Sequence, residues 1–239
     1  MKHFYSVHTS TTAGRDLFNG PALLSHDVTL DKEGEGPQIL IYHTHSQEAF
    51  KDSGPQGRTI VEVGDYLAEL LTQKGYRVYH DTSVYDLQSG VLDRSKAYNY
   101  ALEGVNRILQ QNPSIQVVLD LHRDGVSENL HMVSDINGKP TAQIMFFNGL
   151  SRTPEGKIAY LPNPYLAENL AFSLKMQLGA QAYFPGFARK IYLKGLRYNL
   201  HLRPKSALIE AGAQTNTFEE VKTPWSPWTQ LLDMVLQGE

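Results

Sequence analysis

Two histidines and a glutamate occur together directly behind an apolar run. In "IYHTHSQEAF", residues 41–50, His43 and His45 are two residues apart and Glu48 follows three residues after His45. Imidazole and carboxylate groups are ligands that Zn²⁺ prefers, and a catalytic zinc site combines three such ligands with a water molecule. The stretch therefore carries the ligand types of a metal site that can hydrolyse a bond.

Two further apolar runs also end in ionisable residues. "VVLDLHRD" contains Asp120, His122 and Asp124, and "ALIEAG" contains Glu210. Two imidazoles and one carboxylate around Zn²⁺ form a catalytic arrangement, with a further carboxylate acting as base. His45, Glu48, His122 and Glu210 supply these groups in full.

Each of these side chains also has a purely structural interpretation. A single histidine at the end of a strand more often forms a structural hydrogen bond than it binds a metal. Glu210 differs, because a glutamate that follows "ALI" in a buried strand must be neutralised, paired or linked to a metal. Ionisable groups at three separate strand ends favour the metal site.

The sequence does not settle which member of the histidine pair is the ligand. On a continuous strand His43 and His45 share one face, so both could reach the same metal. We prefer His45, because it lies nearer the carboxyl end of the strand and stands three residues from Glu48. His43 is then expected to support a ligand or to contact substrate.

Other polar residues are expected around these groups. Asp120 could orient the His122 ring through its second nitrogen, as carboxylates often do beside metal ligands, or it could be a satisfied buried aspartate. Arg94, Arg123 and Arg197 could neutralise substrate carboxylates. Tyr98 is expected to pack rather than to act.

The elements that would position these residues alternate between strand and helix. Apolar spacing predicts strand 37–43, helix 59–74, strand 76–80, helix 94–109 and a strand ending at residue 122. A hairpin is expected around Asn137-Gly138, followed by a helix from residue 166 to about Gly179, strand 206–212 and a closing helix around residues 228–235. This order predicts an α/β domain with a mostly parallel sheet flanked by helices, whose ligand edge is formed by the carboxyl ends of the strands.

Composition narrows the class of protein. The chain has 239 residues, 41% of them hydrophobic, a net charge of -3 and no cysteine. Disulfides and thiolate sites are thereby excluded, and nothing in the charge favours nucleic acid as a partner. No segment approaches the roughly 20 apolar residues of a membrane span, and the N-terminus has no signal-peptide pattern. We expect one domain, preceded over residues 1–37 by an arm or edge element.

Four ordered motifs resemble one known family. "IYHTHSQEAF", "VVLDLHRDG", the segment from "NLAFSLKMQLG" to "LRYNLHL" and "SALIEAGAQTNTFEE" are similar to stage II sporulation protein P, a peptidoglycan hydrolase family of endospore-forming bacteria. The resemblance extends from about residue 38 to residue 221. It implies a fold like that of the zinc-dependent N-acetylmuramoyl-L-alanine amidases, with about six strands and the hairpin as an insertion, over residues 38–239.

The resemblance also assigns roles. It implies that His45 and His122 bind Zn²⁺ and that Glu210 is catalytic. The remaining amidase ligand departs from the pattern, because this chain has Gln56, Gly57 and Arg58 where the broader amidases have a carboxylate before the first helix. We therefore transfer that role to Glu48, with Glu62 as the alternative.

The resemblance further implies an activity and a setting. We expect amidase cleavage between N-acetylmuramic acid and L-alanine, together with endopeptidase cleavage in stem-peptide cross-links. We also expect peptidoglycan and sporulation protein D as partners, and a membrane anchor that lies outside this chain. The location would be the space between mother cell and forespore during engulfment. The same residues allow two alternatives: a carboxypeptidase-like zinc enzyme and an inert wall-binding module.

Overall fold

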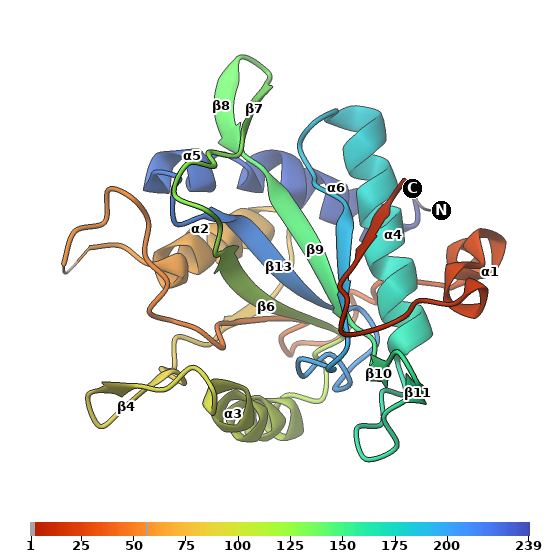
Figure 1. The fold of residues 1–239 in the computed structure, drawn as a ribbon. Coiled ribbons are helices and arrows are strands. Elements are labelled where there is room, and N and C mark those ends of the chain that lie inside the picture. Colours follow the sequence, from red (N-terminus) through yellow and green to blue (C-terminus); the bar gives the residue numbers. More distant parts are fainter. Residues whose placement is uncertain (1–2, 56) are drawn as a thin grey trace.

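A seven-stranded sheet forms the centre of the molecule (Figure 1). The computed structural model describes residues 3–55 and 57–239, so Gln56 lies outside the described residues. The strand order is β1-β12-β9-β13-β6-β2-β3, and β9–β13 is the antiparallel pair among otherwise parallel neighbours. The strands are β1 (Tyr5–Val7), β2 (Ile39–Tyr42), β3 (Val78–His80), β6 (Val117–Asp124), β9 (Ile144–Gly149), β12 (Ile191–Lys194) and β13 (Ser206–Ala213).

The mostly parallel sheet confirms the predicted fold class. Helices after β2 and β3 return the chain so that β2, β3 and β6 run in the same direction, as parallel crossovers require. The sheet has seven strands where about six were expected, and the short strands β1 and β12 form one edge of it. The helices are α1 (Gly20–Ser25), α2 (Ile60–Gln73), α3 (Ala97–Gln111), α4 (Leu166–Tyr183), α5 (Phe218–Lys222) and α6 (Trp225–Gln237), with a 3₁₀ turn at Arg15–Phe18.

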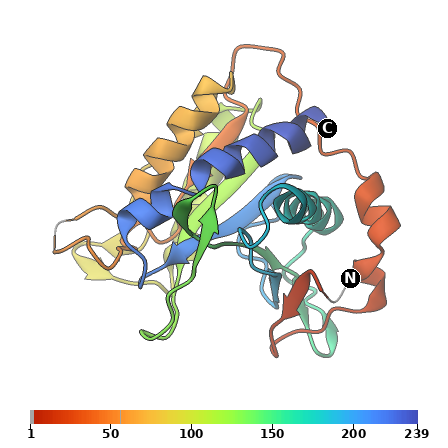
Figure 2. The same cartoon turned by 90° about the horizontal axis from the view of Figure 1, so that it is seen from above.

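The two faces of the sheet are covered differently (Figures 1 and 2). Helices α2, α4, α5 and α6 contribute to a large apolar core against one face, which includes the fully buried Trp225 and Trp228. On the other face α3 packs against β2 and β6 through a smaller cluster that contains Leu40, Tyr42 and Val118. This side therefore keeps part of the sheet free of helices.

The first long helix begins and ends where local chemistry predicts. Thr59 caps the N-terminus of α2 with its side chain, and the Glu62 carboxylate accepts a hydrogen bond from the Thr59 backbone N–H. The two contacts form a capping box. Beyond the helix Gly75 has a φ of +85°, a conformation that glycine adopts without strain. The amphipathic pattern of residues 59–74 is thus matched by α2.

The expected hairpin is present as β7 (Val133–Ile136) and β8 (Lys139–Ala142), which pair antiparallel. Asn137 and Gly138 both have positive φ, 55° and 78°, as a tight two-residue turn requires. The hairpin projects away from the sheet (Figure 1). Two smaller hairpins are β4 (Leu87–Gln88) with β5 (Val91–Leu92) and β10 (Arg152–Thr153) with β11 (Gly156–Lys157).

One predicted boundary is wrong. Gly179 does not end α4, which continues to Tyr183. A Cβ atom at Gly179 would lie 3.1 Å from Leu231 of α6, so this glycine allows a close approach between two helices. A glycine that serves packing looks the same in the sequence as one that stops a helix.

The N-terminal segment joins the domain at its edge. β1 pairs with β12, and Tyr5 packs against Phe18 with ring centroids 4.8 Å apart. The backbone N–H of Leu30 donates to the carbonyl of Leu236 in α6. The segment thus supplies an edge element. In the described part of the chain, none of the helices has the length and hydrophobicity needed to cross a membrane.

Candidate metal centre

The carboxyl ends of three strands meet at one edge of the sheet. β2 and β13 both lie next to β6 and run parallel to it. In this register His122 of β6 stands opposite Glu210 of β13, and Tyr42 of β2 stands opposite Asp120. The strands thereby bring the three polar motifs of the sequence to a common place.

His45, Glu48 and His122 form a cluster that can hold a metal ion. One nitrogen or oxygen from each lies within 4.8 Å of the others. The Nδ1 atom of His45 is 3.6 Å from Oε1 of Glu48, and Nδ1 of His122 is 3.5 Å from Oε2. A tetrahedral Zn²⁺ with bonds of 2.0–2.1 Å holds its ligand atoms roughly 3.3 Å apart. These residues therefore fit a zinc ion.

Glu48 is fixed from several sides. Its Oε2 accepts a hydrogen bond from the backbone N–H of Arg123 at 2.9 Å, and Arg94 approaches Oε1 to 3.4 Å. Its own carbonyl accepts from the first residue of α2, Ile60. Burial opposes ionisation, yet His122 and His45 hold the pKa of the Glu48 carboxyl below its usual value. The side chain is thus held as a carboxylate, the form that binds metal.

A second buried carboxylate lies behind His122. Asp120 accepts hydrogen bonds from the N–H and the hydroxyl of Thr44, at 2.9 and 2.7 Å. Its Oδ1 lies 2.8 Å from Nε2 of His122, within ion-pair distance. Burial acts against a charged His122, but Asp120 and Glu48 raise its pKa well above the usual value. Asp120 thus occupies the position expected for a residue that orients the ring.

Glu210 is poised differently from the other carboxylates. Its Oε2 atom is buried and has no hydrogen-bond partner. Burial raises the pKa of Glu210 from 4.5 to about 8, and His122 only partly offsets this. A carboxyl that exchanges its proton near neutral pH is suited to act as a general base and then as an acid.

The structure separates the two histidines of the opening motif. β2 ends at Tyr42, so strand alternation does not continue to His45 and the condition under which the pair would share a face is not met. The His43 ring lies under Gly64 of α2. Its Nδ1 lies 2.9 Å from the Leu121 carbonyl of β6, and its Nε2 lies 2.9 Å from Nε2 of His80 in β3. Burial and His80 lower the pKa of His43 to about 4. His43 is not part of the cluster.

Glu62, the alternative carboxylate, is used elsewhere. Its Oε2 accepts the backbone N–H of Thr59 at 2.6 Å within the capping box. Among the described residues, the group able to hold a metal contains Glu48 and not Glu62. The geometry thus agrees with the choice of Glu48, and its role as a ligand stays a prediction.

The remaining predicted residues have mixed positions. The Arg123 side chain donates to the Ala49 carbonyl at 2.9 Å, so its backbone rather than its guanidinium contacts Glu48. Asp124 accepts a charged hydrogen bond of 2.7 Å from Arg189. Arg197 donates to the carbonyl of Pro162 at 3.2 Å and does not join the cluster.

Tyr98 is a residue that the sequence did not single out for the site. It lies at the start of α3, with its ring 5.5 Å from that of His45 and stacked at 6.5 Å and 15° on that of His122. Burial and the nearby carboxylate of Asp120 raise its pKa well above the usual value, so the hydroxyl stays protonated. The spacing of tyrosines along a helix does not distinguish such a position from ordinary packing.

Comparisons with known proteins identify the family and the fold of this chain. A family model described as stage II sporulation protein P matches residues 7–227. The chain belongs to the stage II sporulation protein P family. One match among curated proteins is stage II sporulation protein P of Bacillus subtilis (strain 168), 23% identical over 208 residues. That match covers 79% of this chain and 48% of the relative, so the chain spans about half the length of the relative.

Solved structures show the same fold for this member of the stage II sporulation protein P family. The CwlD amidase from Clostridioides difficile, solved in complex with the GerS lipoprotein, has a TM-score of 0.53 and 12% identity. The match covers 84% of this chain and 97% of that one. The N-acetylmuramyl-L-alanine amidase Ami1 from Mycobacterium smegmatis has a TM-score of 0.50, also with 12% identity, over 87% and 100% of the two chains. The expected amidase-like fold is therefore confirmed.

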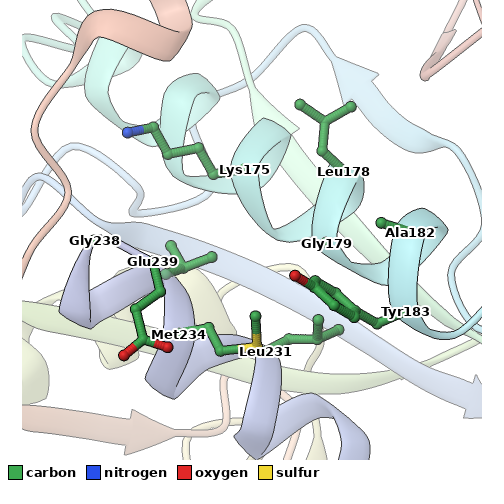
Figure 3. Close-up of a pocket in the computed structure, with 10 residues that line it drawn as sticks. Lys175, Leu178, Gly179, Ala182, Tyr183, Leu231, Met234, Gly238 and Glu239 are labelled. Atoms are coloured by element: carbon green, nitrogen blue, oxygen red, sulfur yellow. The ribbon is translucent and has the colours of Figure 1, made fainter.

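A separate hollow lies away from these residues, between α4 and α6 (Figure 3). Its volume is about 380 Å³, and Leu178, Tyr183, Leu231 and Met234 contribute to its lining. Lys175 borders it and donates to the His26 carbonyl. None of the residues predicted for the metal centre lines this hollow, so it is not part of the candidate site.

Proposed function

We propose that this chain is a zinc-dependent peptidoglycan hydrolase that cleaves the amide between N-acetylmuramic acid and L-alanine. The observation that carries the proposal is the buried, unpartnered Oε2 of Glu210 on the strand next to His122, itself clustered with His45 and Glu48. Family membership and the amidase-like fold support the choice of substrate.

The residues divide the reaction between them. His45, Glu48 and His122 would hold Zn²⁺, which supplies a Lewis acid that polarises the scissile carbonyl and acidifies water. Glu210 takes a proton from the attacking water and returns it to the nitrogen of the leaving amine. Asp120 keeps the His122 ring in place, and Tyr98 limits the access of water to the two histidines.

The setting and the second activity extend this proposal. We include endopeptidase cleavage of stem-peptide cross-links and a role in septal wall remodelling during engulfment, because the family is one of sporulation proteins. Sporulation protein D and other engulfment proteins are the proposed partners. The place of action is extracytoplasmic, at the membrane between mother cell and forespore.

The test combines metal analysis with product analysis. We expect about one zinc per chain, and loss of digestion of purified peptidoglycan when a chelator is added. Glu210→Gln should keep zinc and lose at least 100-fold in turnover, whereas His122→Ala should lose both. The matched control is His131→Ala, because His131 is an exposed histidine that contacts Glu220.

Mass spectrometry of the products separates the alternatives. Free stem peptides with an N-terminal alanine indicate the amidase, and cuts inside cross-links indicate the endopeptidase. Release of single residues from chain ends would replace the proposal with a carboxypeptidase. Full activity of Glu210→Gln would show that Glu210 is not the general base. Zinc binding without any hydrolysis would favour the inert wall-binding module.

A further inference from the structure

The sheet face on the side of α3 is covered unevenly. α3 covers β2 and β6, and Leu200 from the loop after β12 packs on Phe147 of β9 and Leu208 of β13. Beyond these contacts a hollow of about 590 Å³ opens over β9 and β12. Its size lies within the range of 300–1,000 Å³ that is typical of sites for small ligands.

The candidate general base, Glu210, lies at one end of this hollow. Glu210 lines it together with Met145 and Phe147 of β9 and Tyr192 of β12. In the register of the sheet Glu210 faces Met145, and Phe147 faces Tyr192. A ligand bound along this row of residues therefore extends to the group proposed to act on the scissile amide.

The charges of the hollow are not balanced. Arg189, Lys190 and Lys194 line it, and Asp124 pairs with Arg189 at 2.7 Å. Within the described residues, neither lysine has a carboxylate at ion-pair distance, and Lys194 has only the ring of Tyr198 at 5.9 Å. Two positive charges thus face an open hollow in a chain whose net charge is -3.

The spacing of the lysines matches an extended ligand. Lys190 directly precedes β12 and Lys194 ends it, with Tyr192 between them at alternate positions of the strand. At about 3.3 Å per residue, their backbones lie roughly 13 Å apart. A peptide in extended form that carries carboxylates three or four residues apart would reach both, and its backbone would lie over Tyr192.

We propose that the hollow formed by Lys190, Tyr192, Lys194 and Glu210 binds the peptide stem of the substrate through two of its carboxylates. This inference rests on the proposed function for the identity of the peptide. In this arrangement the peptide of the substrate extends along β12, away from Glu210, and the glycan extends toward α3. Lys190 and Lys194 are therefore positioning residues that determine which stems are accepted.

The test uses two soluble N-acetylmuramoyl peptides that differ only in whether their carboxylates are free or amidated. With wild-type protein and zinc, we expect KM to be about tenfold lower for the free form and kcat to agree within twofold. The double variant K190A/K194A should raise KM for the free form by about tenfold and remove the preference, because it removes two charge-assisted contacts. K190R/K194R keeps both positive charges and should retain the preference for the free form.

The control removes the same charge elsewhere. K139A/K157A changes two exposed lysines on the β8 and β11 hairpins and should leave both KM values unchanged. Equal KM values for the free and amidated peptides in wild type would overturn the inference. A fall in kcat at unchanged KM in K190A/K194A would also overturn it.

A binding experiment keeps the inference separate from the hydrolase proposal. Calorimetry of zinc-loaded Glu210→Gln with the free peptide needs no turnover. Binding that weakens about tenfold in the added K190A/K194A background supports the inference even if wild type hydrolyses neither peptide. Suppose instead that wild type hydrolyses both peptides and that neither the lysines nor the free carboxylates affect KM. The hydrolase proposal would then stand, and the inference that the hollow binds carboxylates would be refuted.

Discussion

At the scale of single residues, the centre combines carboxyl groups with opposite tendencies. Glu48 and Asp120 are held ionised by histidines and hydrogen bonds, whereas burial raises the pKa of Glu210 to about 8. Groups whose pKa values are driven apart are typical of sites that need a fixed ligand and a mobile proton. The difference follows from position: Glu48 receives a backbone N–H, and Oε2 of Glu210 receives none.

We predict that Glu210 lowers the free energy of unfolding as pH rises from 4.5 to about 8. Below pH 4.5 the carboxyl is protonated in both folded and unfolded chains, so it contributes nothing. Between pH 4.5 and about 8 the unfolded chain loses this proton while the folded chain keeps it, so stability falls as pH rises. With a chelator present, the free energy of unfolding of Glu210→Gln should exceed that of wild type by on the order of 4 kcal/mol at pH 8. The two values should agree near pH 4.5.

Urea unfolding at the two pH values measures this difference. Glu103→Gln, on the exposed surface of α3, provides the control and should follow wild type at both. A gap that stays constant between pH 4.5 and 8 would show that Glu210 is not held in its protonated form.

At the scale of elements, glycines in helices illustrate how packing overrides propensity. Gly64 lies inside α2, where alanine would normally stabilise a helix by up to about 1 kcal/mol. A Cβ atom at this position would instead lie 2.6 Å from Nε2 of His80 and 2.7 Å from Nε2 of His43. The ring pair under α2 therefore requires a glycine above it.

We predict that Gly64→Ala destabilises the fold by about 2 kcal/mol because it forces the two rings apart. Gly179→Ala is the matched control, since its Cβ would meet only the terminal Cδ2 methyl of Leu231 at 3.1 Å, and it should change stability by less than about 0.5 kcal/mol. Thermal unfolding measures both. If the two variants behave alike, the contact between α2 and the histidine pair does not constrain the helix.

The same scale shows what could be predicted from the sequence. Long periodic elements such as α2 and the buried strands β6 and β13 were predicted, because their apolar patterns are dictated by the layers they face. β1 and β12, of three and four residues, were not predicted. The turn of His43 away from His45 depends on where β2 ends, which the strand expected over residues 37–43 did not reveal.

At the scale of the whole molecule, the candidate metal ligands come from two segments of the chain, which also contact each other through the hydrogen bond from the Arg123 N–H to Glu48. His45 and Glu48 follow β2, and His122 belongs to β6. A ligand that binds only the folded chain stabilises it by about 4 kcal/mol at a concentration 1,000 times its dissociation constant. Zinc should therefore raise the Tm of wild type and of Glu210→Gln. It should leave His122→Ala unchanged, and calorimetry with zinc and then chelator tests this.

The N-terminal segment provides the last prediction. If residues 38–239 form the catalytic domain by themselves, a chain that starts at residue 37 should be as stable as the full chain. The contacts argue otherwise, because Tyr5, Leu23, Val28 and Leu30 are all buried in the main core. At about 1.5 kcal/mol or more for each buried side chain, their loss removes on the order of 6 kcal/mol, a large part of the stability of an ordinary domain.

We therefore expect the chain 37–239 to unfold at a much lower temperature than the full chain and to aggregate through the exposed edge of β12. A chain that starts at residue 9 loses β1 alone and should fall between the two, because α1 and residues 28–30 still cover α4 and α6. Zinc binding at low temperature should survive both truncations, since His45, Glu48 and His122 lie beyond the segment. Equal melting temperatures for all three chains would instead show that the arm is an independent attachment.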